Sequence, residues 1–394
     1  MAGSNSPPST AGTGVAGADE AAGQGIGGTM GAGPMIEAGA GGGPAPVAPD
    51  ASVPTNPRLA ITADFLHKTL SIIDIDSLRD GGKRADALVG EVDLSMYTPA
   101  PMALNVTPDG KTALVSISGG FLGAFITVPA GPGKLLFVDI ETRKVTGELD
   151  VGDSPMGIVF SKDSKRAFVG LYSENYFAVV DIAAKTFKPV STGSGFNEEL
   201  SIDDSGTVGI LTYGPSGNAV TFSVADPMAP LGSTFGLSGD AAGAAFFPGT
   251  KKAFLMQAPT LLTGNVGGHN VIDASNPAMP VSSDNIRVNA HPTTYPVTAV
   301  AARGSIAYPS SANGTVTIVE MKLEGDVAKE VKKVDAGVAG NVAYGITDTP
   351  DGKILIAVPG DHYIGVVDLE AGTAFHVPWD QTEAGPTEIK IVPQ

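Results

Sequence analysis

The chain has 394 residues, a formal net charge of −17 and no cysteine, and only 16% of its residues are charged. It holds no run of 18 or more apolar residues, so no membrane-spanning helix is expected, and the lack of cysteine excludes disulfides and thiolate chemistry. Every Lys and Arg follows position 57, where acids outnumber them and no basic stripe forms, so nucleic acid is not an expected partner.

Residues 1–57 are rich in Gly, Ala and Pro and show no apolar periodicity, which predicts a flexible, disordered tether. The start, Met1-Ala2-Gly3-Ser4, lacks the basic and apolar regions of a signal peptide. One interpretation is a cytosolic protein with a low-complexity leader. The favoured one is an exported protein of the bacterial periplasm or outer cell surface, such as a lipoprotein whose signal and lipid-anchoring cysteine are missing from this chain. Tethers of this composition resemble the mature ends of bacterial surface lipoproteins.

A short apolar phrase, usually containing an aspartate, recurs through residues 58–394. Its copies are Ile72–Ile75, Phe137–Ile140, Val179–Ile182, Thr221–Val224, Val271–Ala274, Ile318–Met321 and Val366–Leu369. Most copies follow one another at 42 to 50 residues. A period in the forties built of short strands is typical of propeller blades, each too small to bury its own faces. We therefore predict an all-β, seven-bladed propeller over residues 58–394.

The clearest blade runs from residue 153 to 193. Strands are expected at 154–161, 166–170, 177–182 and 186–190, which makes four antiparallel strands in one repeat. The turn after the first strand recurs at 108–111, 203–206 and 350–353. Because Asp accepts backbone N–H bonds and Gly adopts positive φ in such turns, these acids are interpreted as structural. The Asp that ends the third strand is interpreted as a turn cap for the same reason.

The motif Ser154-Pro155-Met156-Gly157-Ile158-Val159-Phe160-Ser161, followed by Val179-Val180-Asp181-Ile182, resembles the YVTN-type propeller repeat of bacterial surface-layer and periplasmic proteins. Segments 224–230 and 271–280 are more similar to the related LVIVD repeat. The resemblance covers nearly all of 58–394. It implies the propeller fold and leaves function open, because the family includes scaffolds, binders and enzymes.

The two ends of the repeat region predict how the ring closes. Residues 385–393 form a first strand with no partner strands after it, and residues 58–63 form a second strand with no first strand before it. Joining them completes the seventh blade and removes an exposed strand edge.

Loops after second strands and crossovers before first strands are expected to share one face of the ring. The candidate metal ligands there are His67, His269 and His362, expected in loops before third strands, and His291, expected in a crossover. Neutral imidazoles suit copper or zinc. The favoured interpretation, however, is that a short polar residue simply suits this turn, because Asn175, Asn218 and Asn313 occupy the same place.

Two further chemistries are considered at this face. Calcium could bind acids of the face, which are Asp153, Asp240, Asp361 and Glu198-Glu199, although no contiguous calcium loop is present. Met102 and Met156 occupy matching positions at the channel mouth, where packing is the favoured role over soft-metal ligation. The cofactor therefore stays open between none and a copper, zinc or calcium ion.

The insertion at 118–132 is apolar and glycine-rich, and such loops often mark a partner or ligand site. The candidate contact residues on this face are Phe121, Leu122, Phe125, Tyr172, Asn175 and Tyr295. No nucleophile elbow, phosphate loop or zinc-protease motif is present. The favoured function is an exported binding or scaffold module for a protein or small ligand. A lactonase- or lyase-like enzyme and a copper-type metal-binding propeller are the alternatives.

Overall fold

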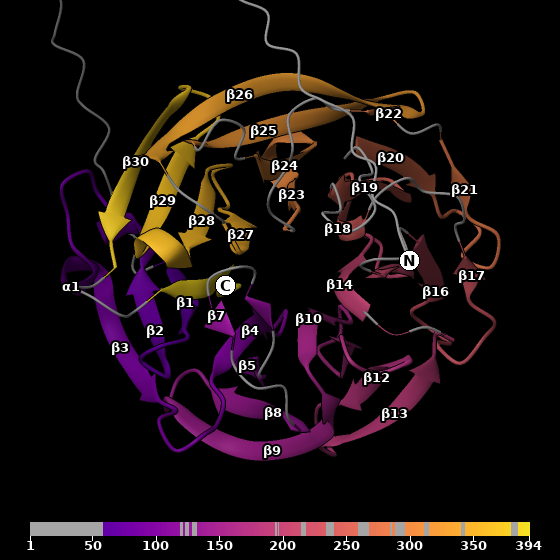
Figure 1. Cartoon of the computed structure of the whole chain (residues 1–394), viewed down its shortest axis with the longest axis horizontal. Helices are drawn as coiled ribbons and strands as arrows, with labels where there is room; N and C mark the ends of the chain where they lie inside the picture. Colours follow the sequence, from indigo (N-terminus) through magenta and orange to yellow (C-terminus); the bar gives the residue numbers. More distant parts are fainter. Residues whose placement is uncertain are drawn as a thin grey trace, which may run out of the picture. The chain divides into compact units, whose positions relative to one another are not determined.

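The computed structural model describes residues 58–118, 121–122, 126–127, 132–193, 195, 197–213, 218–233, 240–258, 268–283, 286–287, 296–310, 315–339, 343–379 and 385–394. These residues form seven antiparallel sheets around a common centre, six of four strands and one of five, so the predicted all-β, seven-bladed propeller is confirmed (Figure 1). The tether expected at 1–57 lies outside the described residues.

Each blade runs outward from an inner strand. The inner strands are β31 (Pro386–Ile391), β4 (Pro101–Val106), β10 (Pro155–Phe160), β14 (Asn197–Ile202), β18 (Asp240–Phe246), β23 (Thr298–Val300) and β27 (Gly345–Asp348). The second strands are β1 (Leu59–Asp64), β5 (Thr112–Ile117), β11 (Arg166–Leu171), β15 (Val208–Tyr213), β19 (Lys252–Ala258), β24 (Ser305–Ser310) and β28 (Ile354–Val358).

The third strands are β2 (Thr69–Asp74), β8 (Pro132–Asp139), β12 (Tyr176–Asp181), β16 (Asn218–Ser223), β20 (Gly268–Asp273), β25 (Thr315–Glu324) and β29 (Tyr363–Asp368). The outer strands are β3 (Leu88–Asp93), β9 (Lys144–Asp153), β13 (Thr186–Ser191), β17 (Gly232–Ser233), β21 (Val281–Ser282), β26 (Val327–Ala339) and β30 (Thr373–Pro378). Two-residue strands add a small hairpin, β6 (Phe121–Leu122) with β7 (Ile126–Thr127), and an extra partner for β20, β22 (Ile286–Arg287).

Helical segments are short in the described part of the chain. They are η1 (Ile75–Ser77), α1 (Arg84–Ala87), η2 (Ala301–Arg303) and η4 (Pro359–Asp361). The α-helix α1 has four residues, whereas a membrane-spanning helix needs about 20. No helix among the described residues is therefore long enough to span a membrane.

The repeated aspartates are turn caps, as predicted. Asp139 Oδ1 accepts a bond of 2.7 Å from the backbone N–H of Thr142, and Asp181 Oδ1 accepts one of 2.8 Å from Ala184. In the turns after the inner strands, Gly110 has φ +70°, a conformation that side-chain-bearing residues rarely adopt. We call the side of the ring with these turns the turn face, and the opposite side the loop face.

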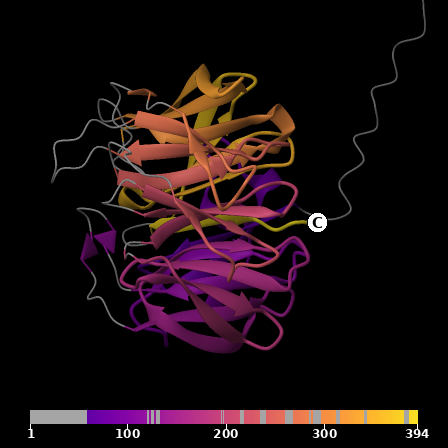
Figure 2. The same ribbon diagram turned by 90° about the vertical axis from the view of Figure 1, so that its right-hand side faces the viewer.

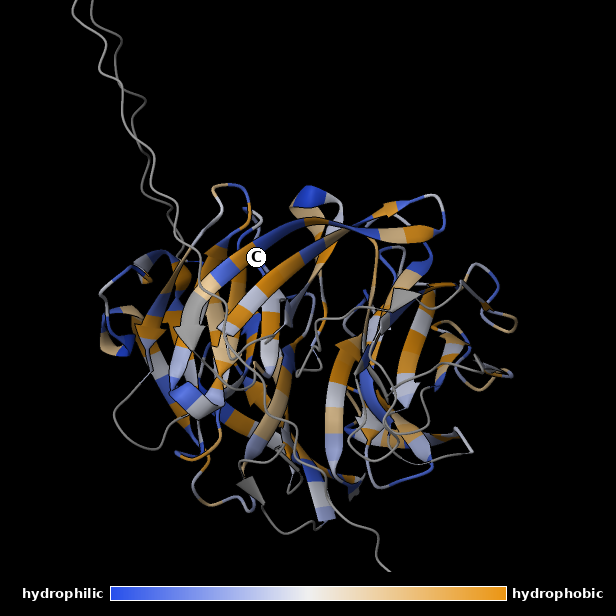
Figure 3. Cartoon of the chain, turned by 45° about the horizontal axis from the view of Figure 1, so that its top comes forward, coloured by the Kyte–Doolittle hydropathy of each residue, from blue (hydrophilic) through white to orange (hydrophobic). Residues whose placement is uncertain are grey.

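The hydrophobic core lies between neighbouring blades. One cluster joins Leu114 and Phe137 of the second blade to Ile158 and Val169 of the third, and all four side chains are buried. Because both faces of each sheet pack against a neighbour, the second and third strands, such as β11 and β12, are nearly continuous apolar runs. Figure 3 shows apolar residues along many of the strands. Each fully buried Leu or Phe contributes about 1.5–3 kcal/mol.

The C-terminal strand closes the ring, as predicted. β31 pairs antiparallel with β1, from Ala60 opposite Ile391 to Asp64 opposite Pro386, and supplies the inner strand of the blade that β1 begins. Figure 2 shows the C-terminus emerging from one face of the propeller.

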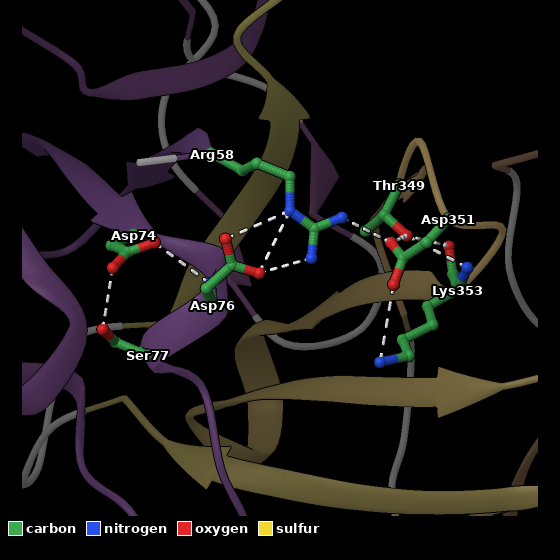
Figure 4. A network of polar contacts seen from close by, with 7 residues as sticks. All are labelled: Arg58, Asp74, Asp76, Ser77, Thr349, Asp351 and Lys353. Atoms are coloured by element: carbon green, nitrogen blue, oxygen red, sulfur yellow. Dashed lines mark hydrogen bonds and ion pairs between the residues drawn. The ribbon is translucent and has the colours of Figure 1, made fainter. Parts of the chain in front are cut away.

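An ion-pair network reinforces this closure on the turn face (Figure 4). Arg58 Nη1 donates a hydrogen bond of 2.7 Å to Asp351 in the last blade, and Arg58 Nε donates one of 3.0 Å to Asp76 in the first. Burial opposes ionisation of Asp351, but hydrogen bonds from Thr349 and Arg58 outweigh it and lower its pKa to about 2. Arg58 thus connects the first and last blades beside the strand pairing.

Candidate functional site in the central channel

Several of the inner strands that line the channel carry a β-bulge near the loop face. The pairing register shifts between Pro101 and Leu104 in β4, between Pro155 and Ile158 in β10, and between Asn197 and Leu200 in β14. In β31 the corresponding irregularity falls between Pro386 and Glu388, opposite Ala63 and Asp64. Bulges re-aim side chains and are frequent beside functional sites.

The bulge brings two glutamates to equivalent positions on opposite parts of the ring. Aligned by their bulges, β14 carries Glu199 and β31 carries Glu388 where β4 and β10 carry Ala103 and Gly157. The backbone N–H of Glu199 leaves the regular ladder and bonds to Thr212 Oγ1 at 3.1 Å, which holds the bulge in place.

Glycines on the adjoining blades make room for both acids. A Cβ at Gly157 would lie 3.0 Å from Glu199 Oε2, and one at Gly345 would lie 2.6 Å from both Cα and Oε1 of Glu388. These contacts are shorter than ordinary van der Waals distances, so any larger residue at Gly345 would displace Glu388. The small residues are therefore part of the site.

A cavity of about 70 Å³ lies between the inner strands at this level. Its polar lining consists of Glu199, Glu388, Lys390 and Asn105, and its apolar lining includes Leu104, Ile158, Leu200, Val297 and Ile346. A second cavity of about 300 Å³ shares Asn105, Val159, Leu200, Ala244 and Val297 with the first and extends to Pro108, Ile202 and Ala299 near the turn face. The two cavities together trace a channel that widens toward the turn face.

Lys390 is the ammonium group of this cavity. Its Nζ lies 3.3 Å from Glu388 Oε1 and donates a hydrogen bond of 3.2 Å to the backbone oxygen of Ile346. Among the described residues, no hydrogen bond or ion pair reaches the Glu199 carboxylate. The site therefore contains one carboxyl group paired with Lys390 and one that has neither a hydrogen-bond donor nor an ion-pair partner among the described residues.

Burial is the main cause of the raised pKa values of the acids in and near the site. It raises the pKa of Glu199 to about 7, with a further increase from the nearby charge of Glu388 and a partial offset from Lys390. Burial also raises the pKa of Glu388. Asp348, at the end of β27, has its pKa raised by burial to about 6, although it accepts a bond of 3.1 Å from the backbone N–H of Ala301. A carboxyl group that titrates near neutral pH can hold or release a proton there.

The histidines predicted as metal ligands are spread over different environments. His67 is exposed between β1 and β2, and His362 caps η4 with φ +56°, so both lie in loops of adjacent blades as expected. His269 lies within β20 instead of in the loop before it; its ring stacks on Phe254 at 5.0 Å, and burial lowers its pKa. His291 lies outside the described residues. In the described ranges, no three His, Asp or Glu side chains come close enough to hold a metal ion.

The predicted loop-face contact residues are only partly described. Phe121 and Leu122 form β6, whereas Phe125 and Tyr295 lie outside the described residues. Tyr172 is half-buried after β11, and Asn175 is exposed in the same loop.

Met102 and Met156 occupy matching positions in β4 and β10, as predicted. Met102 is buried against Phe65 and Ala100, and Met156 packs on the same cluster. Their packing role is therefore visible in the described residues.

Sequence reasoning noticed Glu199 as an acid of one face but missed its partners Glu388 and Lys390. The signal was an alignment of inner strands, in which Asn197-Glu198-Glu199-Leu200 matches Pro386-Thr387-Glu388-Ile389. That match places a glutamate before the first apolar residue in two blades.

Several solved structures have a similar fold. A functionally unknown protein from Desulfotomaculum acetoxidans has a TM-score of 0.65 at 14% identity, over 86% of this chain and 100% of that one. The periplasmic gluconolactonase PpgL of Pseudomonas aeruginosa has a TM-score of 0.60 at 12% identity, over 86% and 99%. Hydrazine synthase of Kuenenia stuttgartiensis has a TM-score of 0.55 at 19% identity, over 69% and 77%. At these identities the likeness shows the propeller fold alone. No family model and no curated protein sequence matches the chain.

Proposed function

We propose that this protein is an exported bacterial propeller of the YVTN type, with two LVIVD-like blades, that binds a small polar ligand in its central channel. The observation that carries the proposal is the cavity between the inner strands, where Glu199, Glu388 and Lys390 converge between apolar walls. Ligand sites in proteins typically combine such an apolar lining with a few placed polar groups. The Gly/Ala/Pro-rich segment at 1–57 supports export to the periplasm or outer surface, with a lipid anchor.

Binding in the channel is tested by a thermal-shift screen of small polar compounds, followed by calorimetry. The blocking variant is Val159→Trp, because Val159 lines both cavities. The matched control is Val281→Trp, at a valine of the outer strand β21 that is 67% exposed. Ligands that stabilise the native protein and the control but not Val159→Trp support the proposal. Ligands that stabilise all three proteins equally would place binding elsewhere.

A partner surface on the loop face is a separate part of the proposal. The segment 118–132 and the histidines of that face supply its predicted residues, and loops on a rigid scaffold commonly carry binding. Crosslinking of the intact protein at Tyr172, which is half-buried on that face, compared with the outer-rim residue Val281, would locate such a partner.

A lactonase- or lyase-like enzyme is the second candidate, favoured by one observation. Burial raises the pKa of Glu199 to about 7, which suits a general acid or base at neutral pH. Hydrolysis of aldonolactones by the purified protein, abolished in Glu199→Gln and retained in the surface variant Glu141→Gln, would establish this activity. Equal background hydrolysis by all three proteins would reject it.

A further inference from the structure

The charges of the channel cavity are unevenly matched. Lys390 lies 3.3 Å from Glu388 and is also held by the backbone oxygen of Ile346 at 3.2 Å. Glu199 faces the same cavity, and its carboxylate has no donor among the described residues. Once both acids are ionised, the cavity carries one more negative than positive charge. A ligand that completes the site must therefore supply a positive charge and hydrogen-bond donors.

The groups that the cavity offers to a ligand favour an organic cation over a metal ion. A calcium ion needs six to eight oxygen ligands, and the described residues bring no three acidic or histidine side chains together around one point. A primary ammonium group needs fewer oxygen ligands than calcium. It carries three N–H donors, and a single carboxylate can pair with it. The walls beside Glu199 are apolar, formed by Leu104, Ile158 and Leu200, and they match the alkyl part of an amine.

The cavity volumes set the size of the ligand. About 70 Å³ is available beside the charged groups, and about 300 Å³ follows in the wider part toward the turn face. An ammonium group with a short aliphatic chain fits this division. Its charge and the start of its chain, against Leu104 and Ile158, lie at the narrow level, and the rest of the chain passes Leu200 into the wide one. The net charge of −17 also attracts cations to the protein over a distance.

We propose that the ligand of the channel is a small primary alkylamine, bound as the ammonium ion by Glu199, with its chain against Leu104, Ile158 and Leu200. This proposal rests on the proposed channel-binding function and names its ligand class. Glu388 and Lys390 then act as a preformed pair that keeps a second cation out of the remaining space.

The test is isothermal calorimetry at pH 8 and constant ionic strength with n-butylammonium, compared with 1-butanol and butyrate, which have the same chain and no positive charge. We expect n-butylammonium alone to bind. Its affinity should fall at least tenfold in Glu199→Gln and stay unchanged in Glu141→Gln, a matched variant at an exposed turn. Binding should also weaken on going from pH 8 to pH 5, because protonated Glu199 no longer carries the charge that attracts the ammonium ion.

Thermal denaturation of Glu199→Gln without ligand checks that the variant is folded. If 1-butanol or butyrate binds as well as n-butylammonium, and Glu199→Gln makes no difference, the channel still binds ligands but the ammonium assignment is wrong. If none of these probes binds, the ammonium assignment is also rejected. The proposed channel-binding function is rejected as well only if the thermal-shift screen of small polar compounds also finds no ligand.

Discussion

The indole Nε1 of Trp379 donates a hydrogen bond of 2.8 Å to the carboxylate of Asp64, and the two residues are 315 positions apart in the sequence. Asp64 ends β1 in the first blade, and Trp379 follows β30 in the last, so the bond crosses the seam where the ring closes. Both side chains are almost completely buried, at 1% and 0% exposed. Arg84 covers the indole ring at 5.7 Å. Closure therefore depends on a buried polar contact as well as on strand pairing.

Replacing Trp379 by Phe should destabilise the propeller. The change removes the indole donor, and a buried carboxylate that loses a donor costs about 1–3 kcal/mol. Urea denaturation followed by fluorescence or circular dichroism measures the loss. Tyr97→Phe is the control, because it removes a donor to the carboxylate of Glu148 at 2.8 Å on the surface and should cost much less. Equal losses in the two variants would contradict a special role for the buried bond.

Deleting residues 385–394 should open the ring. The deletion removes β31, leaves the edge of β1 unpaired and exposes the core next to Ile389, which is fully buried. Loss of several kcal/mol is expected from the combined packing and strand edge. Deleting only residues 393–394 leaves β31 intact and is the control. Calorimetry should show a lower melting temperature for the longer deletion only, and an unchanged one would disprove closure by this strand.

Arg58→Ala should reduce stability at neutral pH by about 1 kcal/mol or less, because the pairs with Asp76 and Asp351 are partly exposed. The pKa of Asp351 is about 2 in the folded protein, below its value of 3.8 in a free chain. Its contribution is therefore present above about pH 4 and is lost as the pH falls through about 2. The stability gap between Arg58→Ala and the native protein should narrow over the same interval. A gap independent of pH would contradict the ion-pair origin.

Glu199→Gln should stabilise the protein at alkaline pH. Glu199 has a pKa of about 7 when folded and 4.5 as a free side chain, so ionisation destabilises the folded state as the pH rises from 4.5 to 7. The variant should be more stable by on the order of 3 kcal/mol at pH 8 and equal to the native protein below pH 4.5. Urea titrations at several pH values measure this, with Glu141→Gln as the control. A native protein that is the more stable of the two at pH 8 would contradict the burial of a carboxylate that has no hydrogen-bond donor.

Gly345→Ala should disturb the channel without touching the rest of the ring. The new Cβ would approach Glu388 Cα to 2.6 Å, and overpacking of this kind costs about 1–3 kcal/mol. Gly195→Ala is the control, since the nearest atom to its added Cβ is 3.6 Å away. Thermal melting of both variants measures the effect, and only Gly345→Ala should melt at a lower temperature. Unchanged stability of Gly345→Ala would show that β27 and β31 move apart freely.

The positions of the histidines show where local sequence reasoning stops. His67 and His362 lie in the predicted loops because both precede a third strand of the regular repeat. His269 also precedes an apolar phrase, yet it belongs to β20, pairs with Met256 and stacks on Phe254. Stacking against a neighbouring strand buries its ring, and no periodicity in the sequence reports that contact.

The sequence by itself determined the seven blades, their turn caps and the strand that closes the ring. These features repeat at a nearly fixed period and depend on neighbours a few residues away, so the amino acids of one blade are enough to predict them. The tertiary structure alone decided that Glu199, Glu388 and Lys390 share one cavity. They come from β14 and β31, which lie in separate blades, and ring closure brings these inner strands around one channel. The raised pKa of Glu199 follows from that convergence, because burial and the charge of Glu388 act only in the closed ring.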